Sequence, residues 1–164
     1  MHDNNIEFLI HKKEYELEKI KNFIQKNKNI NGNLTILKLV KLYIQNNKLN
    51  DAKKILEISR KYSIDSNIFN LYSLKIAQIQ FQNGSLKKSI NIINSIQDDS
   101  WDYIKNNFKG DIYFKLNKVE HALHLWKKNI TQKNFFDFNK IIEMKINYLM
   151  KFSHNFNLKN NKRR

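Results

Sequence analysis

The two histidines His121 and His124 are the residues whose types and spacing come closest to metal chemistry. Three residues apart on a helix, both imidazole rings can reach one metal ion. A stable site needs further ligands, and the sequence offers no third ligand at a matching spacing. We therefore expect His121 to be exposed and His124 to pack near Trp126 or to face water. The prediction is that the protein has no metal and no cofactor.

The sequence also shows none of the common sets of catalytic residues. The sequence has no Cys, no Gly-rich phosphate loop, and no Ser, His and acid that a helical frame would bring together. Asp98, Asp99 and Asp111 stand at helix starts, where a carboxylate compensates the helix dipole without general acid–base work. Trp101 and Trp126 are interpreted as core or cap contacts rather than as stacking platforms for bases. We predict that the protein is not an enzyme.

The charge balance is strongly basic, with a formal net charge of +15 in 164 residues. Taken alone, this charge suggests an anionic partner such as nucleic acid or a lipid surface. However, Asn, Lys, Ile, Phe and Tyr are over-used together, as expected of an AT-rich coding sequence, and Lys is spread over every predicted helix. We interpret the charge as compositional drift and expect no nucleic-acid partner. A basic surface for RNA or membranes stays open as an alternative.

Composition favours a chain that is almost entirely helical. Pro and Cys are absent and there are only three Gly, which removes the commonest helix breakers and all disulfides. The length suits one sizeable core. We predict one helical domain at residues 1–152 and a basic disordered tail at 153–164. Its first helix is expected at Ile6–Asn27, closed by an Asn-rich link with Gly32, and its last at Phe135–Phe152.

A helix–turn–helix unit recurs between these two helices. In the stretch from Phe108 to Ile130, Gly110 lies three residues before Tyr113, Ala122 follows nine after Tyr113, and Trp126 four after Ala122. A small residue one turn from a large one on the same face is typical of tetratricopeptide repeats. The equivalent small residues of the three units, Ala52, Ser89 and Ala122, lie 37 and 33 residues apart, close to a period of ~34.

The elements that this register predicts are three helix pairs. They are expected at 34–45 with 51–62, at 68–81 with 86–96, and at 101–116 with 119–130. The fold class is therefore all-α, a tetratricopeptide-like solenoid of about three helix–turn–helix repeats with a leading helix and a C-terminal capping helix. A terminal helix of this kind covers the exposed apolar face of the last repeat.

The first helix of each pair lines the concave face of such arrays, where extended peptides or partner helices bind. The predicted partner-binding positions on that face are Leu37, Lys41 and Ile44, then Leu74, Gln78 and Phe81, then Asn107, Asp111 and Phe114. An alternative is that the apolar members bury against neighbouring helices, including the leading one. Both interpretations stay open at this point.

The C-terminal part resembles a known family. The residues that carry the resemblance are Trp101 after an acidic turn, Lys109-Gly110-Asp111, Ala122 with Trp126, and above all the segment from Glu143 to Leu149, Glu-Met-Lys-Ile-Asn-Tyr-Leu. They are similar to the ancillary subunit of the Sec translocon, the YfgM family of Gram-negative bacteria. Upstream, from about Glu18 to Ile96, the repeat frame fits that family in length and turn placement.

The resemblance implies a non-enzymatic accessory of the SecYEG translocon. Members of the family have a short cytoplasmic start, one membrane-spanning helix and a periplasmic tetratricopeptide domain that helps pass secreted chains to periplasmic chaperones such as PpiD. It therefore implies the periplasmic side of the cell inner membrane.

The sequence contains no run of the ~18 apolar residues that such an anchor needs. We expect either that the start is internal to a longer gene product or that the anchor has been lost, in which case the protein is a soluble cytoplasmic adaptor.

Overall fold

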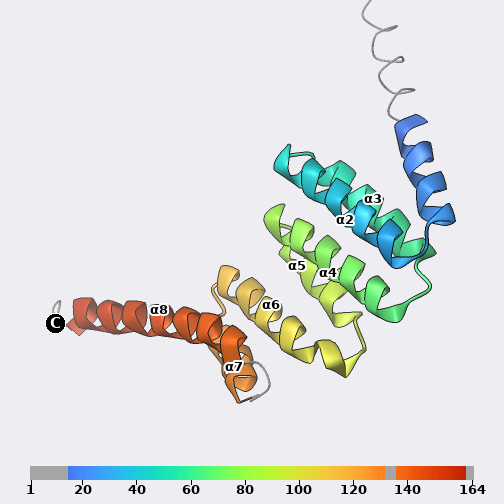
Figure 1. The fold of residues 1–164 in the computed structure, drawn as a ribbon. Helices are drawn as coiled ribbons and strands as arrows, with labels where there is room; N and C mark the ends of the chain where they lie inside the picture. The colour runs from blue at the N-terminus through green and yellow to red at the C-terminus, as the bar shows by residue number, and fades with distance from the viewer. Residues whose placement is uncertain (1–14, 132–135, 162–164) are drawn as a thin grey trace, which may run out of the picture. The chain divides into compact units, whose positions relative to one another are not determined.

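The computed structural model describes residues 15–131 and 136–161, which form helices joined by short turns (Figure 1). No β-strand occurs in those two stretches. The predicted all-α, tetratricopeptide-like fold class is confirmed. The chain divides into two compact units, residues 1–96 and 97–164, which are described in turn. The domain limit at residue 152 stays a prediction.

The first unit holds a helix over residues 15–26 and two helix pairs. The pairs are α2 (Ile30–Gln45) with α3 (Leu49–Tyr62), and α4 (Ser66–Gln82) with α5 (Leu86–Asn94). The remainder of the predicted leading helix, residues 6–14, lies outside the described residues. At the start of α4, Asp65 caps the helix, because its Oδ1 accepts a 2.9 Å hydrogen bond from the Ile68 amide.

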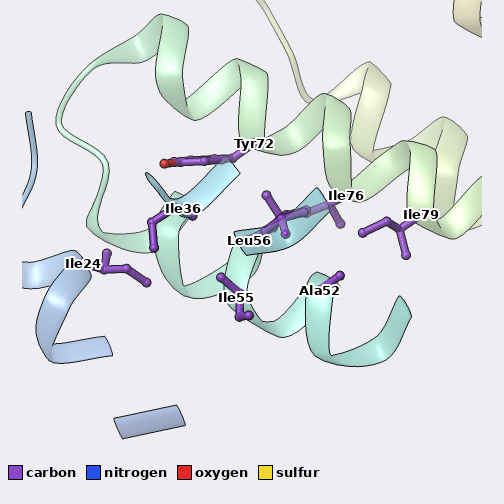
Figure 2. Packing of buried hydrophobic residues seen from close by; sticks show 9 residues of the cluster. Ile24, Ile36, Ala52, Ile55, Leu56, Tyr72, Ile76 and Ile79 are labelled. Carbon is purple, nitrogen blue, oxygen red and sulfur yellow. The ribbon is translucent and has the colours of Figure 1, made fainter. Parts of the chain in front are cut away.

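The core of this unit combines side chains from the leading helix, α2, α3 and α4 (Figure 2). Ile24 brings the leading helix into this core, so that helix packs on the repeats after it. In the middle of α4, Tyr72 is buried and its hydroxyl donates a 2.8 Å hydrogen bond to Asn33 Oδ1 on α2. The buried members of the cluster are Ile24, Ile36, Val40, Ala52, Ile55, Leu56, Tyr72, Ile76 and Ile79.

The start of α2 corrects one sequence prediction. The link predicted to close the leading helix includes Gly32, but this residue lies in the first turn of α2. Asn29 is the N-cap, since its Oδ1 accepts a 2.9 Å hydrogen bond from the Gly32 amide. A Cβ at Gly32 would lie 2.8 Å from the Asn27 carbonyl carbon. This glycine therefore allows a tight entry into the helix instead of ending one.

The second unit holds a 3₁₀ turn, η1 (Asp99–Trp101), and three helices, α6 (Asp102–Lys115), α7 (Val119–Ile130) and α8 (Phe136–Asn161). Asp98 caps the 3₁₀ turn through the Ser100 amide, so Asp98 and Asp99 stand at a helix start as predicted. The same prediction is wrong for Asp111, which lies inside α6. The predicted last helix is longer than expected, because α8 continues to Asn161 and no Pro or Gly follows residue 152 to stop it. Residues 162–164 lie outside the described part.

The core of the second unit forms where α8 packs on α6 and α7. Ile142, Ile146 and Leu149 of α8 are buried with Tyr103, Ala122 and Trp126. These three apolar residues recur at spacings of four and three, which puts them on one face of the helix. The prediction that the last helix covers an apolar face of the last repeat is confirmed within this unit.

The three turns between paired helices share one geometry. Each places a residue in the left-handed region, with φ of 57° at Asn47, 74° at Gly84 and 59° at Asn117. Glycine and asparagine are the residues that adopt this conformation at least cost. In each turn the next amide then donates to a carbonyl five residues back: Lys48 to Tyr43, Ser85 to Gln80 and Lys118 to Tyr113, at 2.8, 2.8 and 2.9 Å.

Burial confirms the register of the repeats. The small residues of the second helices, Ala52, Ser89 and Ala122, are all fully buried. The residues at the other equivalent positions of the three repeats are buried as well: Val40 and Leu56, Ala77 and Ile93, and Gly110 and Trp126. In the third repeat the two lie against each other, because a Cβ on Gly110 would be 2.8 Å from Trp126 Cε2. The largest ring thus packs against the residue that has no side chain.

Candidate binding surface of the repeats

The predicted concave positions of the first repeat lie on α2, between its apolar core face and solvent. Lys41 is exposed, whereas Leu37 and Ile44 are half-buried and pack against the core of the first unit. Leu34 lies three residues before Leu37, and Ile30 lies four residues before Leu34; both are exposed. α2 therefore presents an apolar strip, partly anchored in the core, with one lysine within it.

The concave positions of the second repeat lie on α4. Leu74 is buried, while Gln78 and Phe81 are half-buried. Of the two interpretations left open from the sequence, burial against neighbouring helices therefore holds for Leu74. Gln78 and Phe81 keep part of their surface accessible to a partner.

All charged side chains of these two helices are positive. Neither α2 nor α4 contains an Asp or Glu. Lys38 and Lys41 on α2 are exposed and Lys75 on α4 is half-buried. A segment that binds along these helices would meet apolar side chains and ammonium groups, so an apolar segment with acidic neighbours fits this surface best.

Two of the three predicted concave positions of the third repeat, Asn107 and Asp111, contact α8. Lys145 Nζ lies 2.6 Å from Asp111 Oδ1 and donates a 2.9 Å hydrogen bond to Asn107 Oδ1. Both acceptors belong to α6, so one lysine ties the capping helix to the first helix of the repeat. We call Asn107, Asp111 and Lys145 the polar clamp.

Burial dominates the electrostatics of the clamp. Desolvation raises the pKa of the Asp111 carboxyl above its ordinary value, against the opposing effects of the Lys145 ammonium and of hydrogen bonding. The carboxylate is therefore less favourable here than in water, even with its ion pair. Lys145 therefore offsets only part of the cost of burying the Asp111 carboxylate.

Trp126 contacts two members of the polar clamp, Asn107 and Lys145. Its indole Nε1 donates a 3.2 Å hydrogen bond to the Asn107 carbonyl, and the Lys145 ammonium lies 5.5 Å from the ring centroid. The Phe114 ring is 6.1 Å away, centroid to centroid. With only 2% of its surface exposed, Trp126 is a core residue, as predicted, and offers no stacking platform.

Sequence reasoning missed Lys145 as a member of this site. Asn107, Asp111 and Phe114 were predicted to bind a partner, but the structure brings the first two together to bind Lys145 of the same chain. The available signal was a lysine within the apolar pattern of the last helix. The polar groups of Asn107 and Asp111 are thus engaged within the chain, whereas the third predicted residue of this repeat, Phe114, is 38% exposed on α6. The other predicted residues lie on α2 and α4.

The histidine pair has no metal-site geometry. The His121 ring lies against Tyr113 at a centroid distance of 5.4 Å, and His121 and His124 are both exposed. Among residues 15–131 and 136–161, no three His, Cys, Asp or Glu side chains gather closely enough to hold an ion. Over the same residues, no helix has the length and apolar character to cross a bilayer.

Comparison with known proteins gives a consistent picture. A family model for a tetratricopeptide repeat-like domain matches residues 9–151. A protein of Buchnera aphidicola subsp. Baizongia pistaciae, named ancillary SecYEG translocon subunit, is 50% identical over 147 residues, which is 90% of this chain and 75% of that protein.

Two further proteins with the same name are also similar. The one from Buchnera aphidicola subsp. Acyrthosiphon pisum is 38% identical over 84% of this chain and 72% of its own length. The one from Escherichia coli is 23% identical over 77% of this chain and 62% of its own length. No solved structure matches the chain.

Proposed function

The chain belongs to the family of ancillary SecYEG translocon subunits with a tetratricopeptide repeat-like domain, and from this premise we propose that it is a non-enzymatic adaptor that holds other proteins beside the SecYEG channel. The observation that carries the proposal is the 50% identity, over 90% of this chain, to a protein of that name. The helical repeats over residues 15–131 and 136–161 supply a surface for protein contacts.

The binding surface that we propose is the accessible part of α2 and α4. Leu37, Lys41 and Ile44 on α2 and Gln78 and Phe81 on α4 combine partly exposed apolar groups with a positive charge. A short apolar segment can lie along them, and acidic neighbours in that segment would be attracted by Lys41. Leu74 supports the surface from below because it is buried.

The proposed mechanism is tethered holding. Weak contacts with the channel and with a second protein raise the local concentration of each near the other, without any chemical step. We propose that this helps secreted chains pass to periplasmic chaperones, PpiD among them, on the periplasmic side of the inner membrane. No cofactor enters this mechanism.

Site-specific photo-cross-linking tests the surface. A benzophenone amino acid placed at Gln78 should give cross-links to a SecYEG subunit or to a secreted chain in transit in cells of the source organism. The same probe at Glu57, which is exposed on α3, is the matched control. Cross-links from Gln78 alone support the proposal, whereas equal yields from both positions, or none to either class of protein, contradict it.

A charge variant tests the partner chemistry. Lys41→Glu should lower the yield of cross-links from Gln78 several-fold, because it repels an acidic segment. Lys54→Glu makes the same change in charge at an exposed position of α3 and should leave the yield unchanged. A Lys41→Glu variant with an undiminished yield would rule out an acidic segment as the occupant.

A further inference from the structure

The outward face of α8 is unusual for a helix that caps a repeat. A terminal cap needs a polar outer face for solubility. Here Ile141, Met144 and Tyr148 are 54%, 66% and 56% exposed. Their spacings of three and four residues place them in one stripe along the helix. We call these three residues the outer stripe.

The outer stripe is distinct from the face that packs on the repeat. Ile142, Ile146 and Leu149 are buried in the core of the second unit, and each is offset in sequence from the exposed set. α8 is thus apolar on two sides, one of which is covered within the unit and one of which is open to solvent. Packing in the core of the second unit explains why the buried side is apolar, but it does not explain the apolar residues of the outer stripe.

Lysines accompany the outer stripe. Lys140 and Lys151 are both exposed and stand at the two ends of the stripe, while Glu143 is the single acid among the described side chains 139–151. Across residues 97–164 the sequence has 14 Lys and Arg against 7 Asp and Glu, a formal charge of +7. An apolar stripe with lysines beside it is the pattern of a helix that lies in the surface of an anionic membrane.

We propose that α8 binds the surface of a bilayer that contains anionic lipids, with the outer stripe among the acyl chains and Lys140 and Lys151 at the lipid phosphates. The hydrocarbon stem of a lysine can lie along apolar surface while its ammonium group stays in water. The outer stripe can therefore contact acyl chains at the same time as the two ammonium groups contact lipid phosphates. Each lysine near such a surface strengthens binding about fivefold.

The charge of α8 also favours an anionic membrane over a second copy of the chain as the partner that covers the outer stripe. Two copies paired along the stripe would bring basic faces together, at the positions where Lys140 and Lys151 stand. An anionic lipid surface neutralises the same lysines. The proposal is independent of the translocon contact, because it rests on α8 and uses none of the residues proposed to bind a partner on α2 and α4.

Co-sedimentation of the full chain with vesicles tests the proposal. Binding should be strong to vesicles of phosphatidylglycerol and phosphatidylethanolamine and weak to vesicles of phosphatidylcholine. The Ile141→Ser, Met144→Ser double variant should lose at least about tenfold in affinity, since both side chains are removed from the apolar stripe. The Leu42→Ser, Ile64→Ser variant is the control, because it changes two exposed apolar residues elsewhere.

A charge variant and an optical probe complete the test. Lys140→Gln with Lys151→Gln should weaken binding about 25-fold, whereas Lys54→Gln with Lys61→Gln removes the same charge from α3 and should have little effect. Tyr148→Trp should add an emission that moves to shorter wavelength with anionic vesicles. No binding to anionic vesicles, an equal loss in stripe and control variants, or self-association through the stripe in place of vesicle binding would each overturn the proposal.

Discussion

Adding one methyl group at Gly110 should destabilise the second unit. A Cβ at this position would lie 2.8 Å from Trp126 Cε2 and closer still to the indole nitrogen. The ring has little room to move away, because Trp126 is only 2% exposed and its indole nitrogen donates a hydrogen bond to the Asn107 carbonyl. Gly110→Ala therefore forces either the ring or the α6 backbone to move.

The magnitude follows from two opposing effects. Overpacking of a filled core costs about 1–3 kcal/mol, and overlap with a rigid ring belongs at the upper end of that range. Alanine in a helix interior gains roughly 0.5–1 kcal/mol over glycine. Gly110→Ala should therefore lower the free energy of unfolding by about 2 kcal/mol. For a chain of this length, that corresponds to a fall in melting temperature of roughly 4–8 °C.

The repeats themselves supply the matched rescue. In the second repeat, Ala77 and Ile93 occupy the positions that Gly110 and Trp126 hold in the third, and all four residues are buried. In the Trp126→Ile background the steric conflict is gone, so Gly110→Ala should stabilise the protein by roughly 0.5–1 kcal/mol through helix propensity. The sign of the effect thus reverses between the two backgrounds.

Urea unfolding followed by tryptophan fluorescence measures the effect for Gly110→Ala, and circular dichroism at 222 nm measures it in both backgrounds. Trp101 and Trp126 both belong to the second unit, so their fluorescence reports on that unit. A destabilisation of the same size with and without Trp126 would refute the steric reasoning. So would a stabilising effect of Gly110→Ala in the native sequence.

Three further results are expected from electrostatics and turn geometry. Burial raises the pKa of Tyr72 to about 12, so the stability that it contributes is present below pH 10 and is lost as the pH rises towards 12. An absorbance titration at 295 nm combined with urea unfolding should show this loss, up to about 2.7 kcal/mol. The raised pKa of Asp111 should rise further in Lys145→Gln, as read by carbon NMR of the carboxyl, because the opposing ammonium is removed; a fall in that pKa would contradict the clamp. In the turns, Gly84→Ala should cost about 1 kcal/mol in thermal unfolding, whereas Asn117→Gly should be neutral or slightly stabilising, because only glycine adopts positive φ freely.

The repeat register was predictable from the sequence because it depends on local spacing. Ala52, Ser89 and Ala122 recur at nearly the repeat period, and burying a small residue against a large one fixes each helix pair. Helix starts were predicted where a capping side chain is obvious, as at Asp98. They were missed at Gly32, where a tight turn and a helix start share one residue.

The polar clamp was not predictable in the same way. Lys145 and Asp111 are 34 residues apart, and their contact depends on how α8 is rotated and placed against α6. No local pattern fixes that rotation. The apolar spacing of α8 allowed either of two faces to pack inward, and only the packed structure shows that Ile142 is buried while Ile141 is exposed.

The most direct test of the proposed function is a binding measurement between the full chain and SecYEG of the source organism in nanodiscs of neutral lipid. Neutral lipid removes any contribution from anionic binding by α8. We predict saturable binding to the filled nanodiscs, none to empty ones, and a clear loss in a Lys41→Glu, Gln78→Ala variant that keeps its helical circular dichroism. Equal signals from filled and empty nanodiscs, or undiminished binding of that variant, would contradict a SecYEG adaptor that works through α2 and α4.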